Sequence, residues 1–119
     1  MNRVIKFRAW HTVVCEMLNW DKLKNLRTAI KNKDVILMQF TGLVDKNGVE
    51  IYEGDFDKDF QVVRWCDKKS GYAMSIYDFP TKEHICCHCY NCEGNYDISE
   101  VISELEVIGN IHEHKHLLI

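Results

Sequence analysis

A chain of 119 residues has the length of one domain, and its composition excludes several classes of protein. Hydrophobic residues make up 46% of the chain and charged residues 28%, as in folded soluble domains and unlike disordered or fibrous chains. The formal net charge of −3 argues against an affinity that rests mainly on phosphate contacts. The 15 basic residues are interspersed among 18 acidic ones, which also argues against an acidic mimic of DNA.

The N-terminal residues, the lack of a long apolar run and the cysteines favour a cytoplasmic protein. Arg3, Lys6 and Arg8 interrupt the apolar residues at the N-terminus, so no signal peptide is expected there. No run approaches the roughly 20 apolar residues of a membrane helix, so no membrane association is expected. Thiols stay reduced in the cytoplasm, and the six cysteines are therefore interpreted as thiols or metal ligands instead of a disulfide framework.

The first 34 residues predict two strands followed by a short helix. Ile5, Phe7 and Ala9 alternate with larger polar or aromatic residues, and residues 13–20 are apolar enough to pair back on this first strand. The spacing of Leu23, Leu26 and Ile30 then predicts one face of an amphipathic helix. We expect Asp21 to be its N-cap and Asn32 to end it.

The remainder of the chain predicts antiparallel strands joined by tight turns. Residues 35–40 lead into a hairpin around Asn47 and Gly48, a pair that favours a type I′ turn. Residues 60–65 and 72–79 predict a second hairpin, and residues 105–111 a last strand. The expected fold is mainly β, a single domain over residues 1–119 with a curved antiparallel sheet or small barrel, SH3-like or related, and one short helix. A Cys/His-rich insertion interrupts it at about residues 80–95.

The segment from Met38 to Asp55 resembles the signature of the YopX family, small proteins encoded by phages and prophages of Gram-positive bacteria. Phe7-Arg8-Ala9-Trp10 and residues 107–111 resemble the beginning and end of the family pattern. The resemblance implies a viral protein in the cytoplasm of an infected bacterial host. Ten residues of the segment form its fold signature: Thr41, Gly42, Leu43, Asp45, Asn47, Gly48, Ile51, Tyr52, Gly54 and Asp55.

A cluster of cysteines and histidines at residues 84–92 is the sharpest candidate for a metal site. Cys86, Cys89 and Cys92 have Cys-x-x-Cys spacing, which lets two thiolates bind one zinc ion, and His84 and His88 lie beside them. The alternatives are a loop of reduced cysteines and an oxidised cysteine pair. A structural zinc ion is thus one interpretation, and no other cofactor is expected.

Two further clusters each have a functional and a structural interpretation. Lys22, Lys24, Arg27 and Lys31 lie on the expected helix and could follow a phosphate backbone, with Trp10 or Trp20 stacking on bases, although such faces are usually solvated. Acidic residues around the central hairpin could bind a divalent cation, but turns account for them better. They are Asp45, Glu50, Glu53, Asp55, Asp57 and Asp59.

The residues name no reaction, and we expect a binding protein instead of an enzyme. The main hypothesis is a phage accessory protein that binds a host or immune-system protein, an anti-defence inhibitor such as an anti-CRISPR protein included. The alternatives are a nucleic-acid-binding regulator and a zinc-stabilised interaction module. The sequence leaves the partner open, and it leaves a homo-oligomer open as well.

Overall fold

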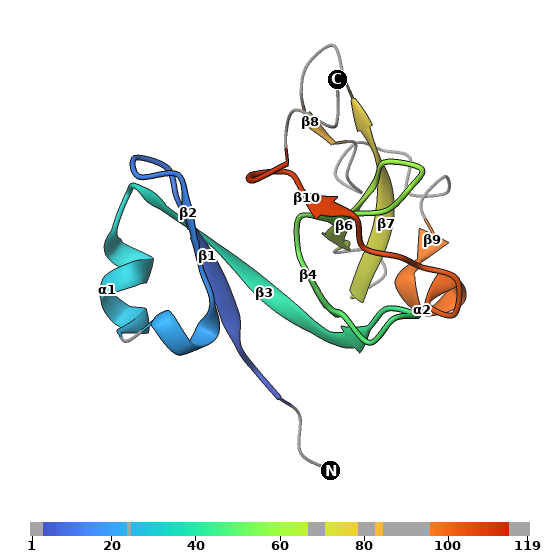
Figure 1. The fold of residues 1–119 in the computed structure, drawn as a ribbon, viewed down its shortest axis with the longest axis horizontal. Helices are drawn as coiled ribbons and strands as arrows, with labels where there is room; N and C mark the ends of the chain where they lie inside the picture. The colour runs from blue at the N-terminus through green and yellow to red at the C-terminus, as the bar shows by residue number, and fades with distance from the viewer. Residues whose placement is uncertain (1–3, 24, 67–70, 79–82, 85–95, 115–119) are drawn as a thin grey trace.

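Two antiparallel sheets build the protein, and the chain runs from one to the other near its middle (Figure 1). The computed structural model describes residues 4–23, 25–66, 71–78, 83–84 and 96–114. Within these residues, no helix combines the length and apolar character needed to cross a bilayer. The mainly β fold of the described residues, with curved antiparallel sheets and one short helix beside two single helical turns, agrees with the prediction from the sequence.

The N-terminal sheet has the strand order β2-β1-β3-β4. Its β1 pairs with β2 and β3, so the first predicted strand and its return strand are confirmed. Alternation along β1 directs Ala9, which is fully buried, to one face of the sheet and directs Arg8 and Trp10 to the other face. The strands are β1 (Phe7–His11), β2 (Glu16–Leu18), β3 (Val35–Val44) and β4 (Glu50–Tyr52).

The predicted helix is present but shorter than expected. A 3-10 turn, η1 (Trp20–Lys22), is capped by Asn19, and α1 (Leu26–Lys31) begins after Asn25, whose side chain accepts a hydrogen bond from the Thr28 N–H. The expected N-cap at Asp21 is wrong because asparagine side chains satisfy the free N–H groups at both starts. Asn32 ends α1 as predicted, whereas Ile30 is 64% exposed and does not join the apolar face.

The C-terminal sheet has the strand order β10-β5-β6-β7-β8, and β9 also pairs with β7. Its longest ladder joins β6 and β7, which confirms the second predicted hairpin. Of the expected strand at residues 105–111, only Gly109 and Asn110 are in a ladder, while Ile108 and Ile111 on either side each donate one backbone hydrogen bond, to the carbonyls of Phe56 and Gly54. The elements are β5 (Asp55–Phe56), β6 (Gln61–Cys66), β7 (Gly71–Asp78), β8 (Glu83–His84), β9 (Tyr96–Asp97), α2 (Ile98–Val101) and β10 (Gly109–Asn110).

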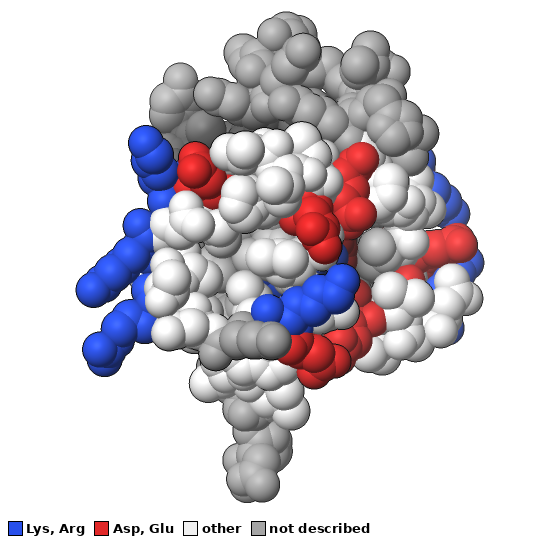
Figure 2. All heavy atoms as spheres, turned by 60° about the vertical axis from the view of Figure 1, so that its left-hand side comes forward, with Lys and Arg blue, Asp and Glu red and all other residues white. Residues whose placement is uncertain are grey.

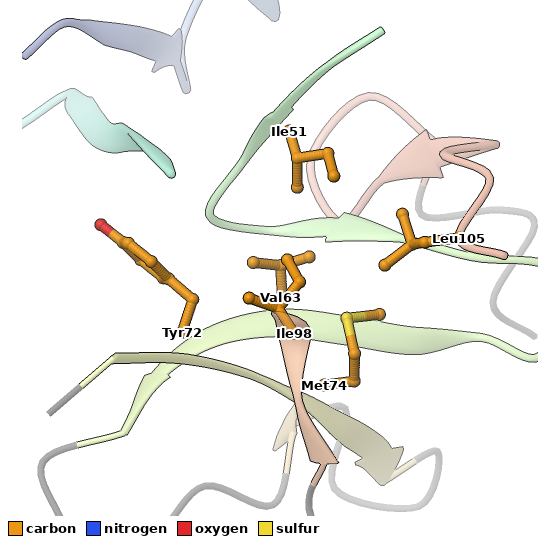
Figure 3. Close-up of a cluster of buried hydrophobic side chains, with 6 residues drawn as sticks. All are labelled: Ile51, Val63, Tyr72, Met74, Ile98 and Leu105. Atoms are coloured by element: carbon orange, nitrogen blue, oxygen red, sulfur yellow. The ribbon is translucent and has the colours of Figure 1, made fainter. Parts of the chain in front are cut away.

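The main hydrophobic core draws side chains from both sheets and from the C-terminal segment (Figure 3). Ile51 of β4 meets Val63 and Met74 of the β6–β7 hairpin, and all three are at most 1% exposed. Ile98 of α2 and Leu105 close the cluster. Burying each such aliphatic side chain contributes about 1.5–3 kcal/mol, so the sheets stabilise each other through this core.

A bulge near the end of β3 prepares the hairpin. The register of the β3–β4 pair shifts between Phe40 and Val44, and Gly42 adopts a φ of +87° there. The Thr41 hydroxyl donates to the Ile51 carbonyl at 2.8 Å and accepts from the Leu43 N–H at 3.2 Å. The threonine side chain therefore replaces ladder bonds that the bulge interrupts.

The hairpin is present at Asn47 and Gly48, but the expected type I′ turn is wrong. That turn needs positive φ at both central residues, whereas Gly48 has a φ of +82° and the described non-glycine residues with positive φ are Cys15 and Phe60. Asp45 N–H donates to the Val49 carbonyl at 2.8 Å, which closes a three-residue loop. The Asp45 carboxylate favours this longer loop, because its Oδ1 accepts from the N–H groups of Asn47 and Val49.

A second turn repeats this arrangement twelve residues later. Asp57 Oδ1 accepts from the N–H groups of Asp59 and Gln61 at 3.0 and 2.9 Å, and Asp57 N–H donates to the Gln61 carbonyl. Phe60 takes the place that Gly48 has in the first turn, with a φ of +59°. Its ring lies 6.0 Å from that of Phe56, a packing contact that helps to hold an unfavourable backbone conformation.

We predict that Asp45→Ala lowers the free energy of unfolding by about 2–4 kcal/mol, because it removes the acceptor of three backbone N–H groups. Two belong to the turn, and the third is the Val107 N–H, 2.9 Å from Oδ2. Urea denaturation at neutral pH measures the change. The exposed Asp59→Ala is the control and should stay within about 0.5 kcal/mol of the unsubstituted protein. Equal stability of the two variants would contradict the capping role.

Candidate functional site

The chain passes from one sheet to the other at residues 52–56, which we call the corner. Glu53 N–H donates to the Gln39 carbonyl of the N-terminal sheet at 3.0 Å. Gly54 N–H donates to the Val63 carbonyl of the C-terminal sheet, also at 3.0 Å. The φ of +88° at Gly54 permits this abrupt change of partner, because glycine adopts left-handed conformations without steric cost.

Asp55 joins the corner to the first strand. Its carboxylate is 2% exposed, and its Oδ1 accepts from Arg8 Nη2 at 2.5 Å. Its Oδ2 accepts from the Tyr52 N–H at 2.8 Å, and the Arg8 guanidinium lies 4.7 Å from the centroid of the Tyr52 ring. A carboxylate, a guanidinium and a ring thus hold β1 against the corner from one face of the N-terminal sheet.

The ion pair has a desolvation cost as well as an attraction. Burial raises the pKa of Asp55 above its ordinary value, although the Arg8 charge and the Tyr52 N–H both act in the opposite direction. Arg8 Nε is also buried, without a hydrogen bond to the described residues. Because both Asp55 oxygens are bonded and shielded from solvent, the geometry favours a structural role for this carboxylate over acid–base chemistry.

The two turn aspartates are likewise bonded to the backbone. Burial opposes ionisation of Asp45, but the N–H groups of Val107, Val49 and Asn47 outweigh it and lower the pKa of the carboxyl. Burial raises the pKa of Asp57 despite the N–H groups of Gln61 and Asp59. The acidic cluster of the sequence is thus divided among separate turns and the corner.

A groove at the corner is lined, among the described residues, by Gln39, Glu53, Trp65 and Tyr72. It encloses about 380 Å³. The rings of Trp65 and Tyr72 meet edge to face with centroids 5.3 Å apart, and Trp65 remains 43% exposed. Glu53 Oε1 accepts from the Gln39 N–H at 2.9 Å, so the carboxylate is held at the wall.

A smaller hollow of about 230 Å³ lies beside the Asp57 turn. Its lining combines the turn with the segment that follows α2, and it includes four acidic side chains and one lysine. The lining residues are Asp57, Lys58, Asp59, Gln61, Val101, Glu104, Leu105 and Glu106. Among the described residues, no three histidine, cysteine or acidic side chains are grouped as a metal site requires.

The model of a known protein family, described as YopX protein, matches residues 21–119 of the chain. This chain belongs to the YopX family. A solved structure, protein EF1440 from Enterococcus faecalis, is similar over 99% of this YopX chain and 100% of its own, with 25% identity and a TM-score of 0.59. Curated proteins gave no match. The similarity to EF1440 spans both sheets, including the N-terminal strand that precedes the residues matched by the family model.

The ten residues that the sequence analysis assigns to the YopX signature coincide with positions where the backbone has special requirements. Gly42, Gly48 and Gly54 have positive φ, and a Cβ at Gly54 would lie 3.5 Å from Met38 Sδ. The other signature residues cap turns, bridge the bulge or fill the core: Thr41, Leu43, Asp45, Asn47, Ile51, Tyr52 and Asp55. This distribution indicates that the signature specifies the corner and its hairpin.

The candidate nucleic-acid-binding residues are only partly described. Lys22, Arg27 and Lys31 are exposed on η1 and α1, whereas Lys24 lies outside the described residues. Figure 2 shows several basic side chains along its left edge, and acidic side chains mixed with further basic ones across the middle and the right. The Trp20 ring packs 6.2 Å from Phe7 and the Trp10 ring 6.1 Å from His112, so both rings already have packing partners.

The candidate zinc ligands fall almost entirely outside the described part of the chain. Cys86, His88, Cys89 and Cys92 are not described, and only the backbone of His84, in β8, is. The structural zinc ion therefore stays a prediction from the sequence.

Sequence reasoning missed Arg8 as the partner of Asp55 and missed the groove. A signal existed for part of it, since the predicted hairpin of residues 60–65 and 72–79 brings the Trp65 end of one strand next to the Tyr72 end of the other. Nothing local indicates that Gln39 and Glu53 lie beside this pair.

We predict that Arg8→Met destabilises the protein by about 3–5 kcal/mol at pH 7, because it leaves the Asp55 carboxylate buried without its countercharge. The folded-state pKa of Asp55, already above its ordinary 3.8, should rise further. A raised folded pKa means that stability is gained as pH falls through it. The difference in free energy of unfolding between the unsubstituted protein and the variant should therefore become smaller as the pH falls from 7 to 5.

The control for this prediction is the same substitution in an Asp55→Asn background. The amide cannot ionise, so the effect of Arg8→Met should be smaller there and should not change between pH 7 and pH 5. Denaturant unfolding of the four proteins at both pH values makes the measurement. A deficit that is constant with pH in the Asp55 background would show that the ion pair does not hold the corner.

Proposed function

We propose that this YopX protein is a phage-encoded accessory protein that acts by binding a protein of its bacterial host, without catalysing a reaction. The proposal rests on the positions of the exposed apolar side chains. The five most exposed large hydrophobic residues of the described chain all belong to its first thirty residues: Val4, Ile5, Val13, Val14 and Ile30, each at least 59% exposed. Contiguous exposed apolar surface is typical of sites that bind other proteins, and Val13 and Val14 are neighbours in the chain.

The most accessible part of this surface is the tip of the β1–β2 hairpin. Val13 and Val14 are 68% and 61% exposed there. The tip is not loose, because the Thr12 N–H donates to the Asp34 carbonyl at 2.8 Å and the Val14 N–H donates to His11 Nδ1 at 3.3 Å. A fixed apolar tip loses little conformational entropy when it binds, which favours affinity.

The target we favour is a component of host immunity, reached in the cytoplasm of the infected cell. This part of the proposal rests on the phage and prophage context that the YopX signature implies. A small non-catalytic protein can inhibit such machinery by occupying one of its surfaces, and an anti-CRISPR protein would be one case. The scaffold supports this view, since the carboxylates of Asp45, Asp55 and Asp57 serve the fold.

We predict that capture from a lysate of a Gram-positive host enriches one host protein, and that the double substitution Val13→Asp/Val14→Asp abolishes the enrichment. Charged groups at the tip would have to lose their hydration on binding. Val49→Asp makes the same chemical change at a 48% exposed position elsewhere and should bind normally. With the purified partner, the tip variant should lose at least about tenfold in affinity. Equal capture by all three proteins, or none above background, would contradict the proposal.

A nucleic-acid-binding function is the alternative, favoured by the spacing of Arg27 and Lys31 one turn apart on exposed positions of α1. We expect no binding of generic duplex DNA or single-stranded RNA, even at low salt. Fluorescence anisotropy at several salt concentrations measures it. The double substitution Arg27→Ala/Lys31→Ala should weaken any such binding, and the control Lys58→Ala, at an exposed position, should not. Salt-dependent binding with this pattern would favour the nucleic-acid function over the protein-binding proposal.

A further inference from the structure

The groove of the corner has the chemistry of a site for one positively charged side chain. Among the described residues that line it, two are aromatic, one is an amide and one is the carboxylate of Glu53, and none of these is basic. An aromatic face next to a carboxylate attracts a cation in two ways: through the quadrupole of the ring and through the negative charge of the carboxylate.

Glu53 is positioned to serve as the anionic wall of this groove. The Gln39 N–H holds its Oε1 at 2.9 Å, and a carboxylate can accept several further hydrogen bonds. Arg8 lies beside this residue, but its Nη2 is bonded to Asp55 and approaches the backbone carbonyl of Glu53, at 3.4 Å, instead of its carboxylate. The charge of Glu53 is thus fixed in place before any ligand arrives.

The aromatic wall is equally well defined. Tyr72 is only 8% exposed and belongs to the main core, and it supports the Trp65 ring edge to face. Trp65 remains 43% exposed although its neighbours on the same face, Val63 and Tyr72, are buried. The exposed part of a large ring that a core residue supports is a surface on which a planar cation can stack.

We propose that this groove receives an arginine side chain of a partner protein. The inference rests on the proposed protein-binding function and names a chemical feature of the partner. Arginine fits better than lysine because its planar guanidinium can stack on Trp65 while its N–H groups pair with Glu53. A nucleotide fits worse, since Glu53 would repel its phosphate. The volume, about 380 Å³, is near the lower end for ligand pockets and suits one long side chain.

The test uses the full-length protein with its tryptophans labelled and the peptide Ac-Gly-Arg-Gly-NH2 as probe. The indole N–H resonance of Trp65, assigned with Trp65→Phe, should shift in a saturable way at millimolar peptide. The corresponding lysine peptide should bind more weakly, and the citrulline peptide, which has nearly the same shape without the charge, should produce no saturable shift. Equal shifts with arginine and citrulline, no shift with arginine, or a stronger response to adenosine monophosphate would overturn the inference.

Variants assign the binding to the groove. Glu53→Gln keeps an oxygen acceptor for the Gln39 N–H and should reduce binding of the arginine peptide at least about fivefold. Glu106→Gln, which alters an exposed glutamate paired with Lys46, should leave it unchanged. If Glu53→Gln does not fold, Trp65→Leu tests the other wall, with peptide binding followed by calorimetry. Undiminished binding to a folded groove variant would also overturn the assignment.

The two proposals can fail separately. If the arginine peptide does not bind while host capture still depends on Val13 and Val14, the groove inference fails and the protein-binding function stands. If the peptide binds through Glu53 but no host protein is captured, the function fails and the chemical assignment of the groove stands.

Discussion

The buried carboxylate of Asp55 is the interaction on which the architecture depends. It lies where the chain leaves one sheet for the other, and it bonds both to Arg8 of the first strand and to the Tyr52 N–H of the corner. Breaking such a pair costs more than the pair itself contributes, because the remaining charge stays buried. The common core formed by Ile51, Val63 and Met74 requires the sheets to keep the relative position that this contact fixes.

This constraint explains why the YopX signature lies in the scaffold. The Thr41 hydroxyl bridges a bulge, Asp45 caps a turn and reaches the Val107 N–H, and Gly54 bends the chain at the corner. Each solves a local problem of backbone hydrogen bonding that few other residues can solve. The surfaces that could distinguish one family member from another lie around this frame: the apolar hairpin tip, the basic side of α1 and the groove at the corner.

Sequence patterns predicted what depends on neighbouring residues and missed what depends on distant ones. Alternation predicted β1 and the first strand of the β6–β7 hairpin because the period of two is a local property. The helix start was wrong because several polar residues near Asp21 compete as caps, and the turn type was wrong because Asp45 selects a longer loop than Asn47 and Gly48 alone would form. The pairing of Arg8 with Asp55 joins residues 47 positions apart, and the groove gathers side chains from separate strands. No local period encodes such contacts.

We infer that the corner couples the two sheets into one cooperative unit. Native-state hydrogen exchange under increasing denaturant tests this most directly, by comparing amides of β1 and β3 with amides of β6 and β7. We predict that the most protected amides of both sheets exchange with the same opening free energy and the same denaturant dependence. Exchange of the β1 and β3 amides through a separate opening of lower free energy, while β6 and β7 stay protected, would contradict the claim.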